Sequence, residues 1–134
     1  MKLLVVDDLE AVGMIIAQIV AQGGWQSLYR PDSQGIVELV RDEKVDVLLV
    51  DYFMPDRLGL DAVEELRNAG FDKLPVILFS GDTGAIDMAR AERLNILKVL
   101  GKPLSISELR STISLAKKTI LQQQAAPGPG GTSP

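Results

Sequence analysis

Short apolar runs alternate with amphipathic stretches along most of this chain, and that alternation limits its possible folds more than any other feature. Residues 3–6 are continuously apolar and residues 45–50 are strongly apolar, with Asp46 the one polar residue, which is typical of strands buried on both faces. Residues 25–29, 75–79 and 96–100 predict three further strands, of which 25–29 is the most exposed. The strands are therefore expected to belong to a sheet that is covered on both sides.

Amphipathic segments between these runs predict five helices. They are expected at about residues 9–22, 36–42, 60–68 and 85–94, and from Ser105 onward. Ser105 should cap the last helix, with Glu108 completing a capping box. The buried stripe of this last helix is expected to comprise Ile106, Leu109, Ile113, Ala116 and Ile120.

Strands alternating with helices predict an α/β fold, a doubly wound five-stranded parallel sheet with five helices. The two most apolar runs belong in the middle, which the strand order 2-1-3-4-5 satisfies. This order reverses the winding between the first and third strands, where open α/β sheets bind ligands. The 134 residues suit one domain, expected over residues 1–124, and the Pro- and Gly-rich residues 125–134 predict a disordered tail or linker.

Composition excludes several classes of site. The chain has no cysteine and no histidine, so thiolate catalysis, histidine bases and Cys- or His-ligated metals are ruled out. A bound metal must take oxygen ligands, which favours magnesium, calcium or manganese. A net charge of -4 gives no sign of nucleic-acid binding. No run is long enough to span a membrane and no signal peptide is evident, so a cytoplasmic location is expected.

Polar residues follow four of the predicted strands directly. Asp7 and Asp8 end the first strand, Asp51 ends the third, Ser80 ends the fourth, and Lys102 follows the fifth. Each alone has a structural explanation, as a helix cap, a turn residue or a solvated charge. Capping does not explain why all of them occur at strand carboxyl ends, which meet at one edge of a parallel sheet.

Three carboxylates in one crevice repel each other, and a divalent cation relieves that repulsion. Magnesium suits such an all-oxygen site when a phosphate oxygen and water complete its shell. Asp51 would then be a nucleophile for phosphorus, with Lys102 and the Ser80 hydroxyl contacting the phosphoryl oxygens. The residues thus predict a magnesium-dependent phospho-switch.

Four motifs together resemble the receiver domain of two-component response regulators over residues 1 to about 121. They are Val5-Val6-Asp7-Asp8, Val50-Asp51-Tyr52-Phe53-Met54-Pro55 with Gly59, Phe79-Ser80-Gly81 and Gly101-Lys102-Pro103. The resemblance implies a CheY-like fold and a signalling module, not an enzyme. It also implies a histidine kinase or phosphotransfer protein as the phosphoryl donor.

The resemblance assigns roles to single positions. Asp51 maps to the phosphoacceptor, and Asp8 to a direct magnesium ligand. Asp7 maps to an acid that acts through water, and the carbonyl of Phe53 to the last protein ligand. Ser80 and Lys102 map to the family's hydroxyl and lysine, and the Lys102–Pro103 bond is expected to be cis.

Val99 departs from the family pattern, which often has Tyr or Phe two residues before the lysine. Because Val99 has no ring to rotate, the signal is expected to pass through loop ordering or a change in dimerisation, which makes a homodimer one candidate partner. Residues 91–108 also resemble receivers attached to cyclic-di-GMP phosphodiesterase domains, one candidate downstream output.

Three other functions remain open from the residues. An aspartate-nucleophile phosphatase would carry a second acid two residues after Asp51, where this chain has Phe53. A nucleotide- or flavin-binding module would need a Gly-rich loop after the first strand, where the chain has Asp7 and Asp8. A degenerate receiver would act only as a protein-protein interaction or dimerisation module. The intact acids argue against it and Val99 favours it.

Overall fold

The computed structural model describes residues 1–125, which form a parallel sheet covered by helices on both faces. All four strand pairings are parallel and the order is β2-β1-β3-β4-β5, so the predicted fold class and strand order are confirmed. The elements are β1 (Lys2–Val6), α1 (Glu10–Ala21), β2 (Gln26–Arg30), α2 (Ile36–Asp42), β3 (Val47–Asp51), α3 (Gly59–Asn68), β4 (Val76–Ser80), the 3₁₀ turn η1 (Thr83–Ala85), α4 (Met88–Arg93), β5 (Lys98–Gly101) and α5 (Ile106–Ala125).

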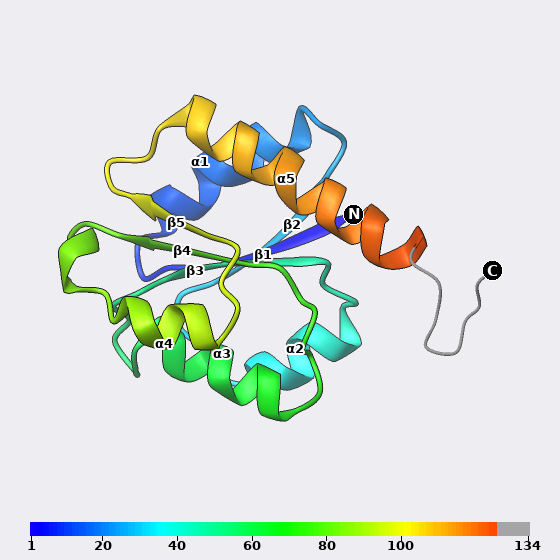
Figure 1. Ribbon diagram of the computed structural model, residues 1–134. Coiled ribbons are helices and arrows are strands. Elements are labelled where there is room, and N and C mark those ends of the chain that lie inside the picture. Colours follow the sequence, from blue (N-terminus) through cyan, green and yellow to red (C-terminus); the bar gives the residue numbers. More distant parts are fainter. Residues whose placement is uncertain (126–134) are drawn as a thin grey trace.

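Alternate residues of each central strand enter opposite cores, because successive side chains of a strand point to opposite faces. Helices α1 and α5 cover one face and α2, α3 and α4 the other, as Figure 1 shows. Leu3 and Leu49 pack on the α1/α5 side, whereas Leu4 and Leu48 pack on the α2–α4 side. Burial on both faces explains the apolar runs 3–6 in β1 and 47–50 in β3.

Several predicted boundaries and one predicted core residue were wrong. Helix α4 begins at Met88 rather than at residue 85, because residues 83–85 form a 3₁₀ turn and the Asp87 side chain caps the helix. Ile106, predicted to belong to the buried stripe of the last helix, is 49% exposed. It is the first residue of α5, and the buried stripe begins one turn later, at Leu109. Ser105 does cap α5, since its hydroxyl accepts a bond from the Glu108 N–H.

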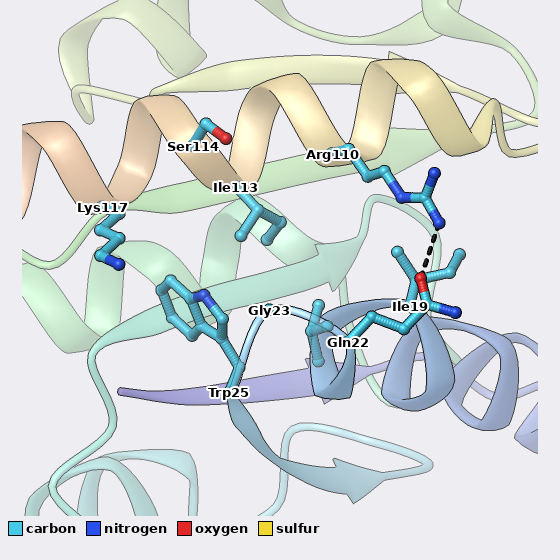
Figure 2. Close-up of a pocket in the computed structure, with 9 residues that line it drawn as sticks. Ile19, Gln22, Gly23, Trp25, Arg110, Ile113, Ser114 and Lys117 are labelled. Carbon is cyan, nitrogen blue, oxygen red and sulfur yellow. Dashed lines mark hydrogen bonds between the residues drawn. The ribbon is translucent and has the colours of Figure 1, made fainter.

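Trp25, predicted to begin an exposed strand, instead precedes β2 and is buried. Its indole lies between the end of α1 and the middle of α5, beside Ile113 and Lys117 (Figure 2). Arg110 closes this pocket by donating a hydrogen bond of 2.7 Å to Gln22. The pocket lies near the amino ends of the strands, at the edge opposite the predicted acidic site.

The predicted disordered tail falls on residues that, from 126 onward, lie outside the described part of the chain. Among residues 1–125, no helix has the length and apolar character needed to cross a membrane.

Candidate functional site

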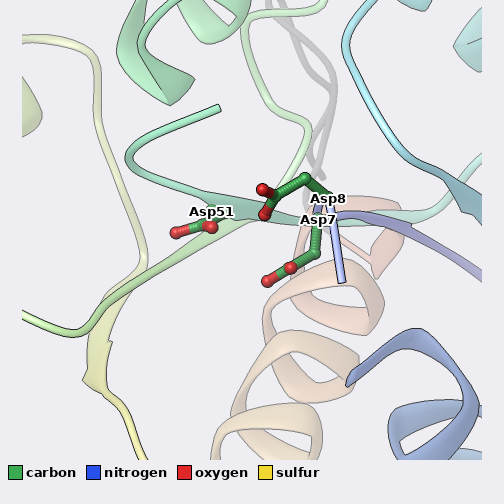
Figure 3. A group of neighbouring side chains, drawn as sticks. All are labelled: Asp7, Asp8 and Asp51. Carbon is green, nitrogen blue, oxygen red and sulfur yellow. The ribbon is translucent and has the colours of Figure 1, made fainter. Parts of the chain in front are cut away.

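Three carboxylates meet where β1 and β3 end (Figure 3). Asp51 is the last residue of β3, and Asp7 and Asp8 directly follow β1. One carboxylate oxygen of each residue lies within 4.8 Å of the others. Because β1 and β3 are neighbouring parallel strands, their carboxyl ends bring together residues more than forty positions apart in sequence.

Lys102 reaches the same cluster from the end of β5. Its ammonium group donates to Asp7 Oδ2 at 2.9 Å and to Asp51 Oδ2 at 3.1 Å. The backbone N–H of Lys102 donates to the Ser80 carbonyl at 2.9 Å, which ties this loop to β4. The Lys102–Pro103 peptide is cis, as the resemblance implied. One cation therefore bridges two of the three acids.

Burial and charge act in opposite directions at this site. Burial raises the pKa of Asp51, and the hydrogen bond from Lys102 only partly offsets that effect. Burial alone would lower the pKa of Lys102, but its hydrogen bonds to Asp7 and Asp51 outweigh it, so the pKa is raised. Lys102 therefore stays cationic, and Asp51 is an anion held in an environment that disfavours its charge.

Ser80 is buried at the end of β4, but its hydroxyl is not bonded to the acids or to Lys102. The Oγ donates to the Asp82 carbonyl and accepts from the Asp82 N–H, each at 3.1 Å. The fold thus places Ser80 beside the loop after β4 and leaves its hydroxyl paired within that loop.

The loop after Asp51 is held tightly against its strand. The Gly59 N–H donates to the Tyr52 carbonyl at 2.7 Å, and a Cβ at position 59 would lie 2.4 Å from the Asp51 carbonyl oxygen. A larger residue at position 59 would displace this backbone. Phe53, the expected carbonyl ligand, pairs with Leu58 in an isolated bridge and has an exposed side chain.

Sequence reasoning missed Tyr29, whose hydroxyl donates to the Asp7 carbonyl at 2.6 Å. Burial, and then the negative charges of Asp7, Glu10 and Asp8, raise the pKa of this phenol, so it remains a donor at neutral pH. Topology offered the signal: Tyr29 lies near the carboxyl end of the strand next to β1.

A second missed group fastens the loop between β3 and α3. The buried Ser33 hydroxyl donates to Asp56 and accepts from Arg57 Nε at 2.7 Å. Burial raises the pKa of Asp56, but hydrogen bonds from Ser33 and the backbone outweigh burial and hold it below its usual value. This network joins the loop before α2 to the loop before α3.

The donor set suits a small, hard cation. All the candidate side-chain ligands are carboxylate oxygens, which magnesium prefers. Within residues 1–125 no hydrogen bond reaches the carboxylate of Asp8, which is exposed, so its oxygens are free for a metal. Asp7 Oδ1 is occupied by the Leu9 N–H at 2.8 Å, which suits an indirect role for Asp7 better than direct ligation.

The family of response regulator receiver domains matches residues 3–114. The chain belongs to this family. Its receiver domain shares 29% identity over 117 residues with the sensory/regulatory protein RpfC of Xanthomonas campestris, covering 85% of this chain and 16% of that protein. It shares 30% identity over 112 residues with the transcriptional regulatory protein CpxR of Klebsiella pneumoniae, covering 84% of this chain and 47% of that protein. The chain thus spans less than half of each of these two relatives.

Solved structures give the same fold for the receiver domain. The chemotaxis protein CheY4 of Vibrio cholerae superposes with a TM-score of 0.78 at 19% identity, covering 86% of this chain and 97% of that one. The N-terminal domain of WS1339 from Wolinella succinogenes gives a TM-score of 0.81 at 22% identity, covering 92% and 98%. The chain is a receiver domain of two-component systems, a family of signalling modules rather than catalysts.

Proposed function

We propose that Asp51 accepts a phosphoryl group from a donor protein and that this modification is the switching event of the receiver domain. The observation that carries the proposal is the cluster of Asp7, Asp8 and Asp51 with Lys102 bridging two of them. Phe53 stands where an aspartate-nucleophile phosphatase would need its second acid, and Asp7 and Asp8 stand where a nucleotide-binding module would need a Gly-rich loop, so the sequence favours the receiver function over both.

The chemistry follows from the charges at the site. A carboxylate oxygen of Asp51 forms a bond to phosphorus while the donor's P–N bond breaks. The leaving imidazole keeps the electron pair of that bond and takes a proton from solvent. Lys102 already contacts Asp51 and would pair with a phosphoryl oxygen on the product. Ser80 could contact a second oxygen after its hydroxyl leaves the Asp82 backbone.

Magnesium is the cofactor that we propose, held by Asp8 and Asp51 directly, by Asp7 through water, and by the carbonyl of Phe53. Bound there, the metal would supply positive charge against the phosphoryl oxygens. This positive charge would also offset the mutual repulsion of the three acids. Among the side chains of the site, Lys102 offsets that repulsion for Asp7 and Asp51.

A histidine kinase or phosphotransfer protein is the proposed donor, because this chain has no histidine to phosphorylate. Relatives include a sensor kinase/phosphatase, CqsS, of Vibrio cholerae. We propose residues 1–124 as the receiver unit, working in the cytoplasm, with residues 125–134 as a tail or linker. The output remains a prediction, whether an attached domain, such as a cyclic-di-GMP phosphodiesterase, or a homodimer.

The direct test is incubation with phosphoramidate, a small donor with a P–N bond, followed by intact mass spectrometry. We expect one phosphoryl adduct on the wild type in Mg²⁺ and none in excess chelator. Asp51→Asn should give no adduct, while the exposed control Asp42→Asn should behave like the wild type. A folded wild-type chain that takes no adduct in Mg²⁺ would overturn the proposal.

A further inference from the structure

We propose that Tyr29 is a positioning residue for the metal site: its hydroxyl fixes the Asp7–Asp8 peptide and thereby aims the Asp8 carboxylate. This inference rests on the proposed function, because it takes Asp8 to be a magnesium ligand. Tyr29 lies on β2, one of the two edge strands, and belongs to none of the motifs that carry the family resemblance.

Besides the bond from Lys102 to Asp7 Oδ2, three hydrogen bonds fix the backbone and side chain of Asp7. The Asp7 N–H donates to the Arg30 carbonyl at 3.1 Å, and the Leu9 N–H donates to Asp7 Oδ1 at 2.8 Å. The third is the bond of 2.6 Å from the Tyr29 hydroxyl to the Asp7 carbonyl. Since this carbonyl belongs to the Asp7–Asp8 peptide, the Tyr29 bond restricts the rotation of the peptide plane that leads into Asp8.

The Asp8 carboxylate depends on that backbone for its direction. Within the described residues it accepts no hydrogen bond, in contrast to both oxygens of Asp7. Asp8 is exposed, so core packing does not hold it either. A ligand whose side chain has no partner of its own is aimed by the peptide from which it projects, and partners that orient ligands strengthen metal binding.

The ring of Tyr29 packs closely against α1 at Gly13, where there is no side chain in its way. A Cβ at position 13 of α1 would lie 2.4 Å from Tyr29 Cδ1, far inside contact distance. Gly13 is buried within α1, where glycine lowers helix stability relative to alanine. The close approach of the ring accounts for glycine at this position, and it lets the hydroxyl reach Asp7.

The test compares Mg²⁺ affinity and phosphorylation in Tyr29→Phe and the wild type. Affinity is read from amide chemical shifts during a Mg²⁺ titration, which needs no phosphoryl transfer. Removing one hydrogen bond should weaken Mg²⁺ binding roughly 3- to 10-fold. The phosphorylation rate at saturating Mg²⁺ should stay within about twofold, because the reacting groups are intact.

A matched control is Tyr52→Phe, which removes the same atom from a tyrosine that bonds to Asp87 instead of Asp7. Its Mg²⁺ affinity should equal that of the wild type. Gly13→Ala should weaken Mg²⁺ binding by displacing the Tyr29 ring. Combined with Tyr29→Phe it should add little further loss, because both changes act through one contact.

The outcomes separate this inference from the proposed function. If the wild type binds no Mg²⁺ and takes no phosphoryl group, the proposed function fails and the inference fails with it. If the wild type does both and Tyr29→Phe binds Mg²⁺ equally well while folded, only the inference is overturned. A loss of stability in Tyr29→Phe without a change in Mg²⁺ affinity would assign Tyr29 to packing and would also overturn it.

Discussion

At the scale of single residues, the fold disfavours the charged form of the Asp51 carboxyl. Asp51 is 6% exposed, its pKa is raised by burial, and two other carboxylates lie nearby. Lys102 contacts it but is shared with Asp7. A site that stabilises a bound cation and a phosphoryl group is expected to be strained by charge when both are absent.

This imbalance predicts that Asp51→Asn stabilises the protein without Mg²⁺. Because the pKa of Asp51 is higher in the folded chain than in the unfolded chain, folding binds protons, and stability falls as pH rises from the ordinary value through the raised one. At pH 7 the substitution should raise the free energy of unfolding by about 0.5 to 2 kcal/mol. Urea denaturation measures it.

The gain should shrink as the pH is lowered from 7 to below the raised pKa of Asp51, because burial favours the protonated carboxyl that the wild type then carries. Asp42→Asn, at an exposed carboxyl, should change the free energy of unfolding by less than about 0.5 kcal/mol at either pH. A wild type more stable than Asp51→Asn at pH 7 would contradict this reading of the site.

The positions of Asp7, Asp8, Asp51 and Lys102 could be predicted because strand ends have a fixed place in a parallel sheet. The contacts made by Tyr29 could not, since a tyrosine on an edge strand is equally consistent with a solvent-facing ring. Ser80 also shows that limit: its place follows from β4, but its bonds to Asp82 depend on the turn geometry of the next two residues.

At the scale of elements, Tyr52 connects the end of β3 to the start of α4. Its ring is buried beside Phe53, with centroids 4.8 Å apart. Its hydroxyl accepts a 3.2 Å hydrogen bond from the Asp87 N–H, immediately before α4. Val99 on β5 packs against the same core cluster without a ring. The residue after the proposed phosphoacceptor thus contacts the start of α4 directly.

Tyr52→Phe should loosen the start of α4. The Asp87 amide loses its acceptor, so its hydrogen exchange should accelerate roughly tenfold, since a typical hydrogen bond contributes about 0.5 to 1.5 kcal/mol. Amides of β1 and β3 should exchange at wild-type rates. Exchange at Asp87 that does not change in the variant would show that this bond does not hold the helix.

Element types were predictable from period and apolar content, and element ends were less so. Asp87 begins α4 through its side-chain bond to the Arg90 N–H, whereas the sequence pattern extended the helix back across Gly84 to residue 85. A short polar segment with two acids near it has several competing capping positions, and packing decides among them.

At the scale of the molecule, metal binding should couple to global stability. A ligand that binds the folded chain alone stabilises it by RT ln(1 + [L]/Kd), which is about 1.4 kcal/mol at ten times Kd. Mg²⁺ at that level should therefore raise the melting temperature of the wild type by roughly 5 °C. Differential scanning calorimetry, with ionic strength matched by NaCl, measures the shift.

The same experiment on Asp8→Asn should give a much smaller shift, because a ligand without another partner has been removed. Equal shifts in both proteins would mean that Mg²⁺ acts through general screening and not through the acidic cluster.

The strand order of the whole molecule followed from the apolar content of residues 3–6 and 45–50, since strands buried on both faces must be central. What the receiver domain controls does not follow from its fold, because many functions share it. The chain spans 16% of RpfC and 47% of CpxR, so the remainder of those proteins carries functions that this domain alone does not reveal.

The central claim, an acyl phosphate on Asp51, is tested most directly by borohydride trapping. Borohydride reduces an aspartyl phosphate to homoserine, which marks the modified residue permanently. Tryptic digestion should yield residues 45–57, bounded by Lys44 and Arg57, and fragmentation separates Asp51 from Asp46 and Asp56 in that peptide. We predict homoserine at position 51 after phosphorylation in Mg²⁺. Homoserine at another acid, or a phosphate on Ser80 with Asp51 unmodified, would contradict the account.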